Sequence, residues 1–161
     1  MSIKVGDKMP EGRFTVMGDS GPGSLSTSEL FSGKKVVLFS VPGAFTPTCS
    51  REHLPGYIEQ ADAFRARGVD TVACMAVNDV FVMEAWANAT GAGDKVLLLA
   101  DGNGDYARAL GMDFDGSGFG LGTRGMRFAM LVDDGVVSAL FAEESPGELK
   151  ASAADRVLAA L

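Results

Sequence analysis

The chain has 161 residues, of which 47% are hydrophobic and 22% charged, a composition typical of one globular domain spanning residues 1–161. Its net charge is −7, and its 14 basic residues are scattered rather than clustered as phosphate recognition requires, which argues against a nucleic-acid partner. No apolar run reaches the roughly 18 residues of a membrane-spanning helix, and the N-terminus lacks the apolar segment of a secretory signal. We therefore expect a cytoplasmic protein without a membrane partner.

The first half of the chain alternates apolar runs with amphipathic ones, as α/β folds do. Lys35–Val41 and Val69–Val77 are predicted to be buried strands. Between them, apolar residues at helical spacing predict a helix over Cys49–Arg67 that ends at Gly68. Pro55 lies inside this helix and is expected to kink it.

The alternation continues through the middle of the chain. A helix capped by Asn78 or Asp79 is predicted through about Ala89. A third strand follows at Lys95–Ala100, and a short helix at Asp105–Leu110.

The last third of the chain carries a strong hairpin signal. Asp134-Gly135 joins the predicted strands Arg127–Asp133 and Val136–Phe141, and Leu149–Leu161 is predicted to be a terminal helix. The order of elements predicts a central mixed sheet with helices on both faces.

The two cysteines, Cys49 and Cys74, are 25 positions apart. This spacing fits neither a disulfide framework nor a zinc site, so we expect free thiols, a reducing compartment and no bound metal.

Cys49 stands where the first strand gives way to a helix, in V-P-G-A-F-T-P-T-C-S. The unpaired N–H groups and the positive dipole end of a helix N-terminus favour a thiolate there. Pro42 and Pro47 stiffen the loop, and the Thr46 hydroxyl is near enough to face the sulfur. A lone cysteine is more often a packed apolar residue, but this setting favours a nucleophile.

The run P-G-A-F-T-P-T-C resembles the P-x-x-x-T-x-x-C signature of the peroxiredoxins, thiol peroxidases with a thioredoxin-like fold. Its surroundings, K-K-V-V-L-F-S before and S-R-E-H-L-P-G-Y after, are similar to the type II branch, the peroxiredoxin five subfamily. Further matching segments are Val72–Val82, Lys95–Asp101 and Arg127–Val137.

The resemblance implies a role for each matching residue. Cys49 corresponds to the peroxidatic nucleophile, Thr46 to the hydroxyl that binds thiolate and substrate, and Pro42 to the proline that shields the sulfenate. Arg127 corresponds to the guanidinium of the site. Together with the backbone N–H groups of Thr48 and Cys49, it would stabilise the charge on the leaving oxygen.

Two assignments stay open. Arg124 is a nearby competitor of Arg127. His53, the only histidine, lies four residues after Cys49 and is either a modulator of the site or, more in keeping with the chemistry, a structural residue beside it.

Cys74 lies in the apolar run T-V-A-C-M-A-V and is predicted to be a packed core thiol. The C-terminal segment lacks the resolving cysteine that some type II relatives carry there. This departure implies a one-cysteine cycle without a prosthetic cofactor, reduced by glutathione and glutaredoxin or, as an alternative, by thioredoxin.

The resemblance also implies a homodimer. Phe45, Pro47, Phe81 and Trp86 are predicted to form its interface, although the aromatic residues also suit a core.

The expected activity is reduction of hydrogen peroxide and small organic hydroperoxides. A peroxide sensor that passes oxidation to a partner is an alternative, as is a redox-inert module of the same fold. A Gly120–Gly125 match to G-x-G-x-x-G precedes a strand instead of following one, so it does not indicate a dinucleotide site.

Overall fold

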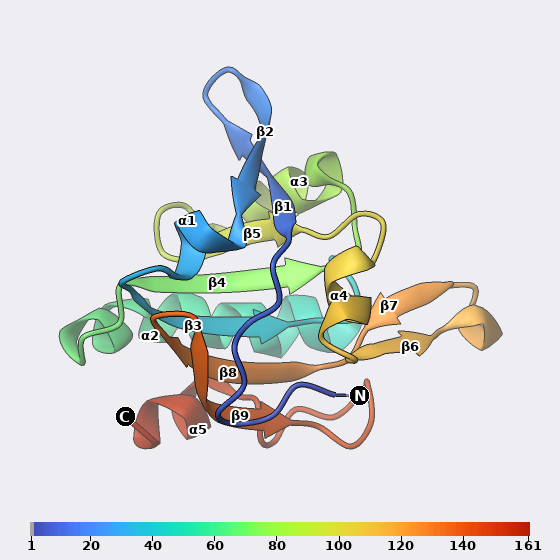
Figure 1. Cartoon of the computed structure of the whole chain (residues 1–161). Helices are drawn as coiled ribbons and strands as arrows, with labels where there is room; N and C mark the ends of the chain where they lie inside the picture. The colour runs from blue at the N-terminus through green and yellow to red at the C-terminus, as the bar shows by residue number, and fades with distance from the viewer. Residues whose placement is uncertain (1) are drawn as a thin grey trace.

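The computed structural model describes residues 2–161, and its centre is a seven-stranded sheet with the strand order β2-β1-β5-β4-β3-β8-β9 (Figure 1). β3 pairs in parallel with β4, and β4 with β5, whereas the other neighbours are antiparallel. The predicted mixed sheet is thus confirmed. Its strands are β1 (Arg13–Gly18), β2 (Gly21–Ser26), β3 (Lys35–Ser40), β4 (Thr71–Ala76), β5 (Leu97–Ala100), β8 (Phe128–Asp133) and β9 (Val136–Ala142).

Helices cover both faces of the sheet, as predicted (Figure 1). α2 (Leu54–Ala66), α3 (Val80–Thr90) and α5 (Ala154–Ala159) pack on one face. α1 (Thr27–Phe31) and α4 (Asp105–Ala109) pack on the other.

β3 lies at the centre of this arrangement and leads into the cysteine loop. Its side chains alternate between the two cores: Val37 and Phe39 pack with α2, whereas Val36 and Leu38 pack on the α1 side. All four are fully buried, which explains why β3 is a continuous apolar run instead of an alternating one. Burial of each such side chain contributes roughly 1.5–3 kcal/mol.

The helix predicted over Cys49–Arg67 is continuous, but it opens with a π-helical turn, η1 (Cys49–His53), before α2. In this turn the Leu54 N–H bonds to the Cys49 carbonyl, five residues back. Pro55 has no N–H to donate, so an α-helical turn there would lose a bond in any case. The irregularity expected at Pro55 is therefore a wider turn just before it.

The C-terminal helix was predicted to begin at Leu149, which is wrong: α5 begins at Ala154. The backbone N–H groups of residues 150–152 instead donate to the Glu143 carboxylate, so this segment is held outside the helix. The β8–β9 hairpin is confirmed, and Asp134 and Gly135 take the positive φ values of its tight turn, 48° and 81°.

Three features were not predicted. These are the β1–β2 hairpin, helix α1, and a small two-stranded sheet of β6 (Asp113–Asp115) and β7 (Thr123–Gly125), joined by the 3-10 turn η2 (Ser117–Phe119). In Figure 1 the β6–β7 hairpin projects at the right, beyond the end of β3. It forms one wall of the site described below.

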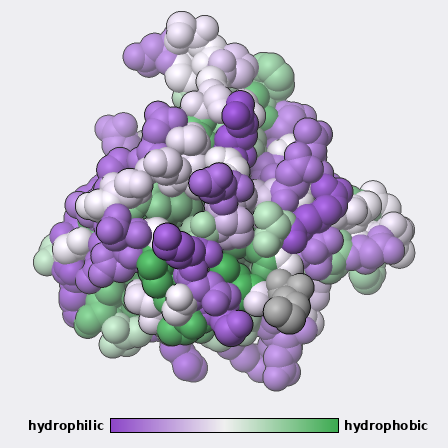
Figure 2. Space-filling model, viewed as in Figure 1, coloured by the Kyte–Doolittle hydropathy of each residue, from purple (hydrophilic) through white to green (hydrophobic). Residues whose placement is uncertain are grey.

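The face seen in Figure 2 is mainly hydrophilic, with hydrophobic atoms showing in its lower half, over β8 and β9. Within residues 2–161, no helix combines the length and the apolar character needed to cross a bilayer.

Candidate active site

The peroxiredoxin-like loop joins the carboxyl end of β3 to the helix that begins at residue 47. Thr46 stands at the cap position, and its carbonyl accepts the first helical bond from the Ser50 N–H at 2.9 Å. Pro47 occupies the first helical position, where its missing N–H costs no bond. Cys49 therefore lies in the first turn, fully buried, where the N–H groups of Thr48 and Cys49 have no acceptor in the preceding turn.

Arg127, directly before β8, points one arm of its guanidinium at the cysteine. Its Nη2 donates to Cys49 Sγ at 3.0 Å, while Nε donates to the Pro146 carbonyl at 3.0 Å and Nη1 to His53 Nδ1 at 2.8 Å. The bonds from Nε and Nη1 fix the orientation of the planar guanidinium, and Nη2 is left to contact the sulfur. Arg127 is 2% exposed, so this cation acts where solvent screening is weak.

His53 lies on the same helical face as Cys49 and is fixed in one tautomer. Its Nε2 lies 3.1 Å from the Ser152 carbonyl, which can only accept, so Nε2 carries the hydrogen and Nδ1 accepts from Arg127. Burial, and then the charge of Arg127, lower the pKa of His53 to about 3. His53 is therefore neutral near pH 7 and is not a proton donor at Nδ1.

The Thr46 hydroxyl does not donate to the sulfur in this structure. It donates to the Gly43 carbonyl at 2.7 Å, which leaves its lone pairs free to accept a hydrogen bond. The Thr48 hydroxyl lies 3.5 Å from the Gly147 carbonyl, at the edge of hydrogen-bonding distance. Pro42 is buried beside this loop.

Arg124, the competitor of Arg127, lies on β7 and contacts the loop instead of the cysteine. Its Nη1 donates to the Pro42 carbonyl at 3.3 Å and its Nε to the Leu121 carbonyl at 2.9 Å. A Cβ atom at Gly43 would come within 2.8 Å of Nη1, so a side chain at position 43 would displace the Arg124 guanidinium from this position. Arg124 thus ties the β6–β7 hairpin to the cysteine loop.

A cleft of about 220 Å³ opens onto this group of residues. Pro42, Thr46 and Arg127 line its inner side, and Phe114, Phe119 and Leu121 of the β6–β7 region form an apolar outer wall. Sequence reasoning missed these three apolar residues, along with Pro146 and Ser152, because none of them lies near Cys49 in the chain. The segment Phe119-Gly120-Leu121 has no pattern from which such a wall could be predicted.

Cys74 lies within β4, fully buried and paired in register with Phe39 of β3. Burial, and then the proximity of Cys49, raise the pKa of Cys74 well above its usual value. Cys74 is therefore a free, neutral thiol in the core, as predicted from the apolar run around it.

The four residues predicted to form an interface divide into two groups. Phe45, Pro47 and Phe81 are exposed, the two aromatic side chains by 53% and 65%. Trp86 is fully buried and donates to Ser50 Oγ at 2.9 Å, so its place in a direct contact surface was wrong: α3 turns this side chain into the core. Phe45 also has a φ of 64°, in the left-handed region that a bulky residue rarely adopts.

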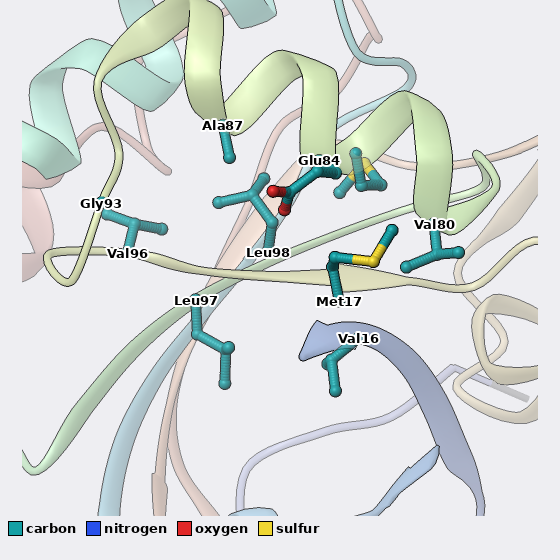
Figure 3. A pocket seen from close by; sticks show the side chains of 10 residues that line it. Val16, Met17, Val80, Glu84, Ala87, Gly93, Val96, Leu97 and Leu98 are labelled. Carbon is teal, nitrogen blue, oxygen red and sulfur yellow. The ribbon is translucent and has the colours of Figure 1, made fainter. Parts of the chain in front are cut away.

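A second cavity, of about 120 Å³, lies between α3, β1 and β5 (Figure 3). Met17, Val80 and Val96 line it, and among the described residues Glu84 is the charged side chain that reaches it. None of Pro42, Thr46 and Arg127 belongs to its walls, whereas all three line the first cleft and Arg127 contacts Cys49 Sγ, so the cleft beside Arg127 is the candidate active site.

Comparisons with known proteins agree with this geometry. The Redoxin family matches residues 4–158. Peroxiredoxin-2E-2, chloroplastic, of Oryza sativa subsp. japonica is 51% identical over 166 residues, which cover 99% of this chain and 73% of that protein. The crystal structure of reduced Prx3 in complex with H2O2 from Vibrio vulnificus has a TM-score of 0.93 and 47% identity, with 98% of each chain covered.

A third similar structure is that of the Plasmodium falciparum antioxidant protein (1-Cys peroxiredoxin), with a TM-score of 0.90, 31% identity and 96% of each chain covered. The family match spans nearly the whole chain, and the relatives agree with it in both sequence and fold. The chain therefore belongs to the peroxiredoxins, within the thioredoxin-like superfamily.

Proposed function

We propose that the protein reduces hydrogen peroxide and small organic hydroperoxides through a sulfenic acid on Cys49. The observation that carries this proposal is the 3.0 Å contact between Arg127 Nη2 and Cys49 Sγ, behind a cleft that Arg127 itself lines. A guanidinium in this position stabilises a thiolate before the reaction and an oxyanion during it.

The step can be written with all atoms accounted for. The Cys49 thiolate attacks the hydroxyl oxygen of R–O–O–H, the S–O bond forms as the O–O bond breaks, and the products are Cys49–S–OH and RO⁻, which takes up a proton. Thr46, whose own hydrogen is donated to Gly43, is suited to accept the hydrogen of the peroxide. Arg127 and the N–H groups of Thr48 and Cys49 are the donors for the developing charge.

We further propose a one-cysteine cycle recycled by an external thiol. Cys74 is fully buried within β4 and neutral, which disfavours it as a resolving residue. One thiol condenses with the sulfenic acid and releases water, and a second thiol reduces the mixed disulfide. Glutathione with glutaredoxin is our first choice of reductant and thioredoxin the alternative. Because both cysteines are free, we propose a reducing compartment, the cytoplasm being our expectation.

The apolar outer wall of the cleft supports organic hydroperoxides as substrates. Phe119 is 87% exposed and would contact an alkyl group whose hydroperoxide reaches Cys49. Replacement Phe119→Ser should raise the KM for cumene hydroperoxide several-fold and leave the rate with hydrogen peroxide unchanged. Equal effects on both peroxides would contradict this part of the proposal.

The experiment that tests the function follows peroxide loss with purified protein in two parallel assays. One contains glutathione, glutaredoxin and glutathione reductase, and the other thioredoxin and its reductase. We expect sustained turnover in the first and less in the second, with none for Cys49→Ser in either. A single turnover that stops in both assays would favour a peroxide sensor. No reaction of Cys49 with peroxide would favour a redox-inert module.

We also propose a homodimer in which the exposed residues Phe45, Pro47 and Phe81 meet their counterparts on a second copy. These residues are apolar and exposed, and they come from the cysteine loop and the first turn of α3, which the bond from the Ala44 N–H to Asn78 Oδ1 at 2.9 Å holds close together.

A further inference from the structure

Glu143 follows β9 directly and is a nearly buried acid, 6% exposed, next to the strand that leads from Arg127. Its backbone N–H donates to the Arg127 carbonyl at 3.1 Å, so the two residues are neighbours across the β8–β9 pair. No lysine or arginine within residues 2–161 forms an ion pair with its carboxylate. The partners of this buried charge must therefore be other donors.

The carboxylate accepts four hydrogen bonds from one short segment. Oε2 accepts from the Lys150 N–H at 2.9 Å, from the Ser152 N–H at 2.7 Å and from the Ser152 hydroxyl at 2.6 Å, and Oε1 accepts from the Ala151 N–H at 3.2 Å. Burial acts to raise the pKa of Glu143, but the bonds from Ser152, Lys150 and Ala151 together lower it. The ionised carboxylate thus fixes residues 150–152.

Fixing this segment fixes the Ser152 carbonyl. That carbonyl lies 3.1 Å from His53 Nε2 and accepts a bond of 2.6 Å from the Tyr57 hydroxyl. It requires a hydrogen on Nε2, which leaves Nδ1 of His53 as the acceptor for Arg127 Nη1. If the carbonyl moved away, one of the two contacts that favour the Nε2–H tautomer would be lost, and the other tautomer, whose Nδ1–H would oppose the guanidinium, would become more populated.

We propose that Glu143 is a positioning residue for the peroxidase reaction: through Ser152 and His53 it sets the direction in which Arg127 points at the Cys49 sulfur. The inference rests on the proposed function of Cys49, but the contacts that carry it lie outside the cleft. Glu143 does not line the cleft and has no substrate to bind, so its effect on rate must pass through Arg127.

The variant Glu143→Gln tests this role, because one of its two terminal atoms becomes a donor that faces N–H groups. The control is Glu144→Gln, the same change at the next position, which is exposed. We expect Glu143→Gln to lower the second-order rate constant of Cys49 with hydrogen peroxide by about 10- to 100-fold, as displacement of catalytic groups does. Glu144→Gln should change this rate constant less than twofold.

A second measurement does not depend on activity. Because His53 is the only histidine, its two ring nitrogens give isolated signals in a long-range ¹H–¹⁵N spectrum. We expect the Nε2–H tautomer in the parent protein and in Glu144→Gln, and a mixture of tautomers in Glu143→Gln. An unreactive parent protein would refute the proposed function, yet this spectrum would still test the positioning of His53.

A double-mutant cycle separates positioning from general destabilisation. In an Arg127→Ala background, Glu143→Gln should cost less than twofold, because the group through which it acts is absent. If Glu143→Gln fails to fold, Ser152→Ala removes one donor to Oε2, keeps the carbonyl and should lower the rate by about two- to fivefold. A parent-like rate and tautomer in Glu143→Gln, or equal losses with and without Arg127, would overturn the proposal.

Discussion

Arg127 donates from Nη1 to Nδ1 of His53 at 2.8 Å, so the only histidine of the chain accepts a hydrogen bond from the cation that also contacts Cys49. A second proton on this imidazole would place two N–H groups opposite each other. The fold therefore depends on a neutral His53, and its stability is linked to pH.

The first prediction concerns that linkage. The pKa of His53 is about 3 in the folded protein and close to 6.5 in the unfolded chain, so the unfolded state takes up the proton first as the pH falls. The stabilisation is complete above about pH 6.5 and is lost as the pH falls toward 3. In urea unfolding, the protein should lose about 2 kcal/mol more between pH 7.5 and 5 than His53→Asn, which keeps an acceptor for Arg127. Equal losses in the two proteins would show that His53 titrates normally.

The second prediction assigns the working cation. Arg127→Ala removes the donor 3.0 Å from Cys49 Sγ, and we expect the rate of sulfenate formation to fall by about 10²–10³-fold with little change in far-UV circular dichroism. Stopped-flow fluorescence of Trp86 can follow the reaction, because its indole bonds to Ser50, the neighbour of Cys49. The matched control is Arg51→Ala, an exposed cation two residues from Cys49. An unaffected rate in Arg127→Ala would transfer the role to Arg124.

The third prediction separates the two thiols. Cys49→Ser should abolish peroxide turnover, whereas Cys74→Ser and Cys74→Ala should keep at least half of it, since the Cys74 thiol is buried and neutral. The serine variant places a hydroxyl in the core and should unfold at a lower urea concentration than the alanine variant. Comparable loss of turnover in the Cys49 and Cys74 variants would mean that Cys74 resolves the sulfenic acid.

The fourth prediction concerns assembly. Phe81→Arg places a charge on the apolar surface of Phe45, Pro47 and Phe81, and sedimentation should show a dimer converted to a monomer. Phe119→Arg alters a phenylalanine that is even more exposed, in the apolar outer wall of the cleft, and should leave the dimer intact. A parent protein that sediments as a monomer, or a Phe81→Arg variant that remains dimeric, would count against this interface.

The elements with a clear apolar period were predictable from sequence. β3 and β4 are mainly apolar, α3 carries Asp79 as a cap that accepts from the Val82 N–H, and Asp134-Gly135 fixes one hairpin. The β1–β2 hairpin was missed because Gly21–Ser26 combines glycine, proline and serine without alternation. Its strand exists because it pairs along β1, a tertiary cause that local sequence does not carry.

The site was predictable where its residues lie close in sequence or match a motif, as Cys49, Thr46, Pro42 and Arg127 do. The rest required the fold. The Ser152 and Pro146 carbonyls are backbone groups, which any residue type would supply, and they approach His53 and Arg127 from 99 and 19 positions away. The C-terminal helix was predicted to begin too early for the same reason, because the Glu143 side chain, directly after β9, competes for the N–H groups of residues 150–152.

The positive φ of Phe45 destabilises the backbone locally, whereas its exposed ring belongs to the proposed dimer interface. Glycine would relieve this backbone strain, which costs on the order of 1–3 kcal/mol, but it would also delete an exposed ring beside Pro47. The Phe45→Gly variant should thus be more stable as a single subunit and should bind a second copy less tightly. The strained backbone of Phe45 would then be a case in which a residue that favours dimer formation is kept at the expense of the stability of the single subunit.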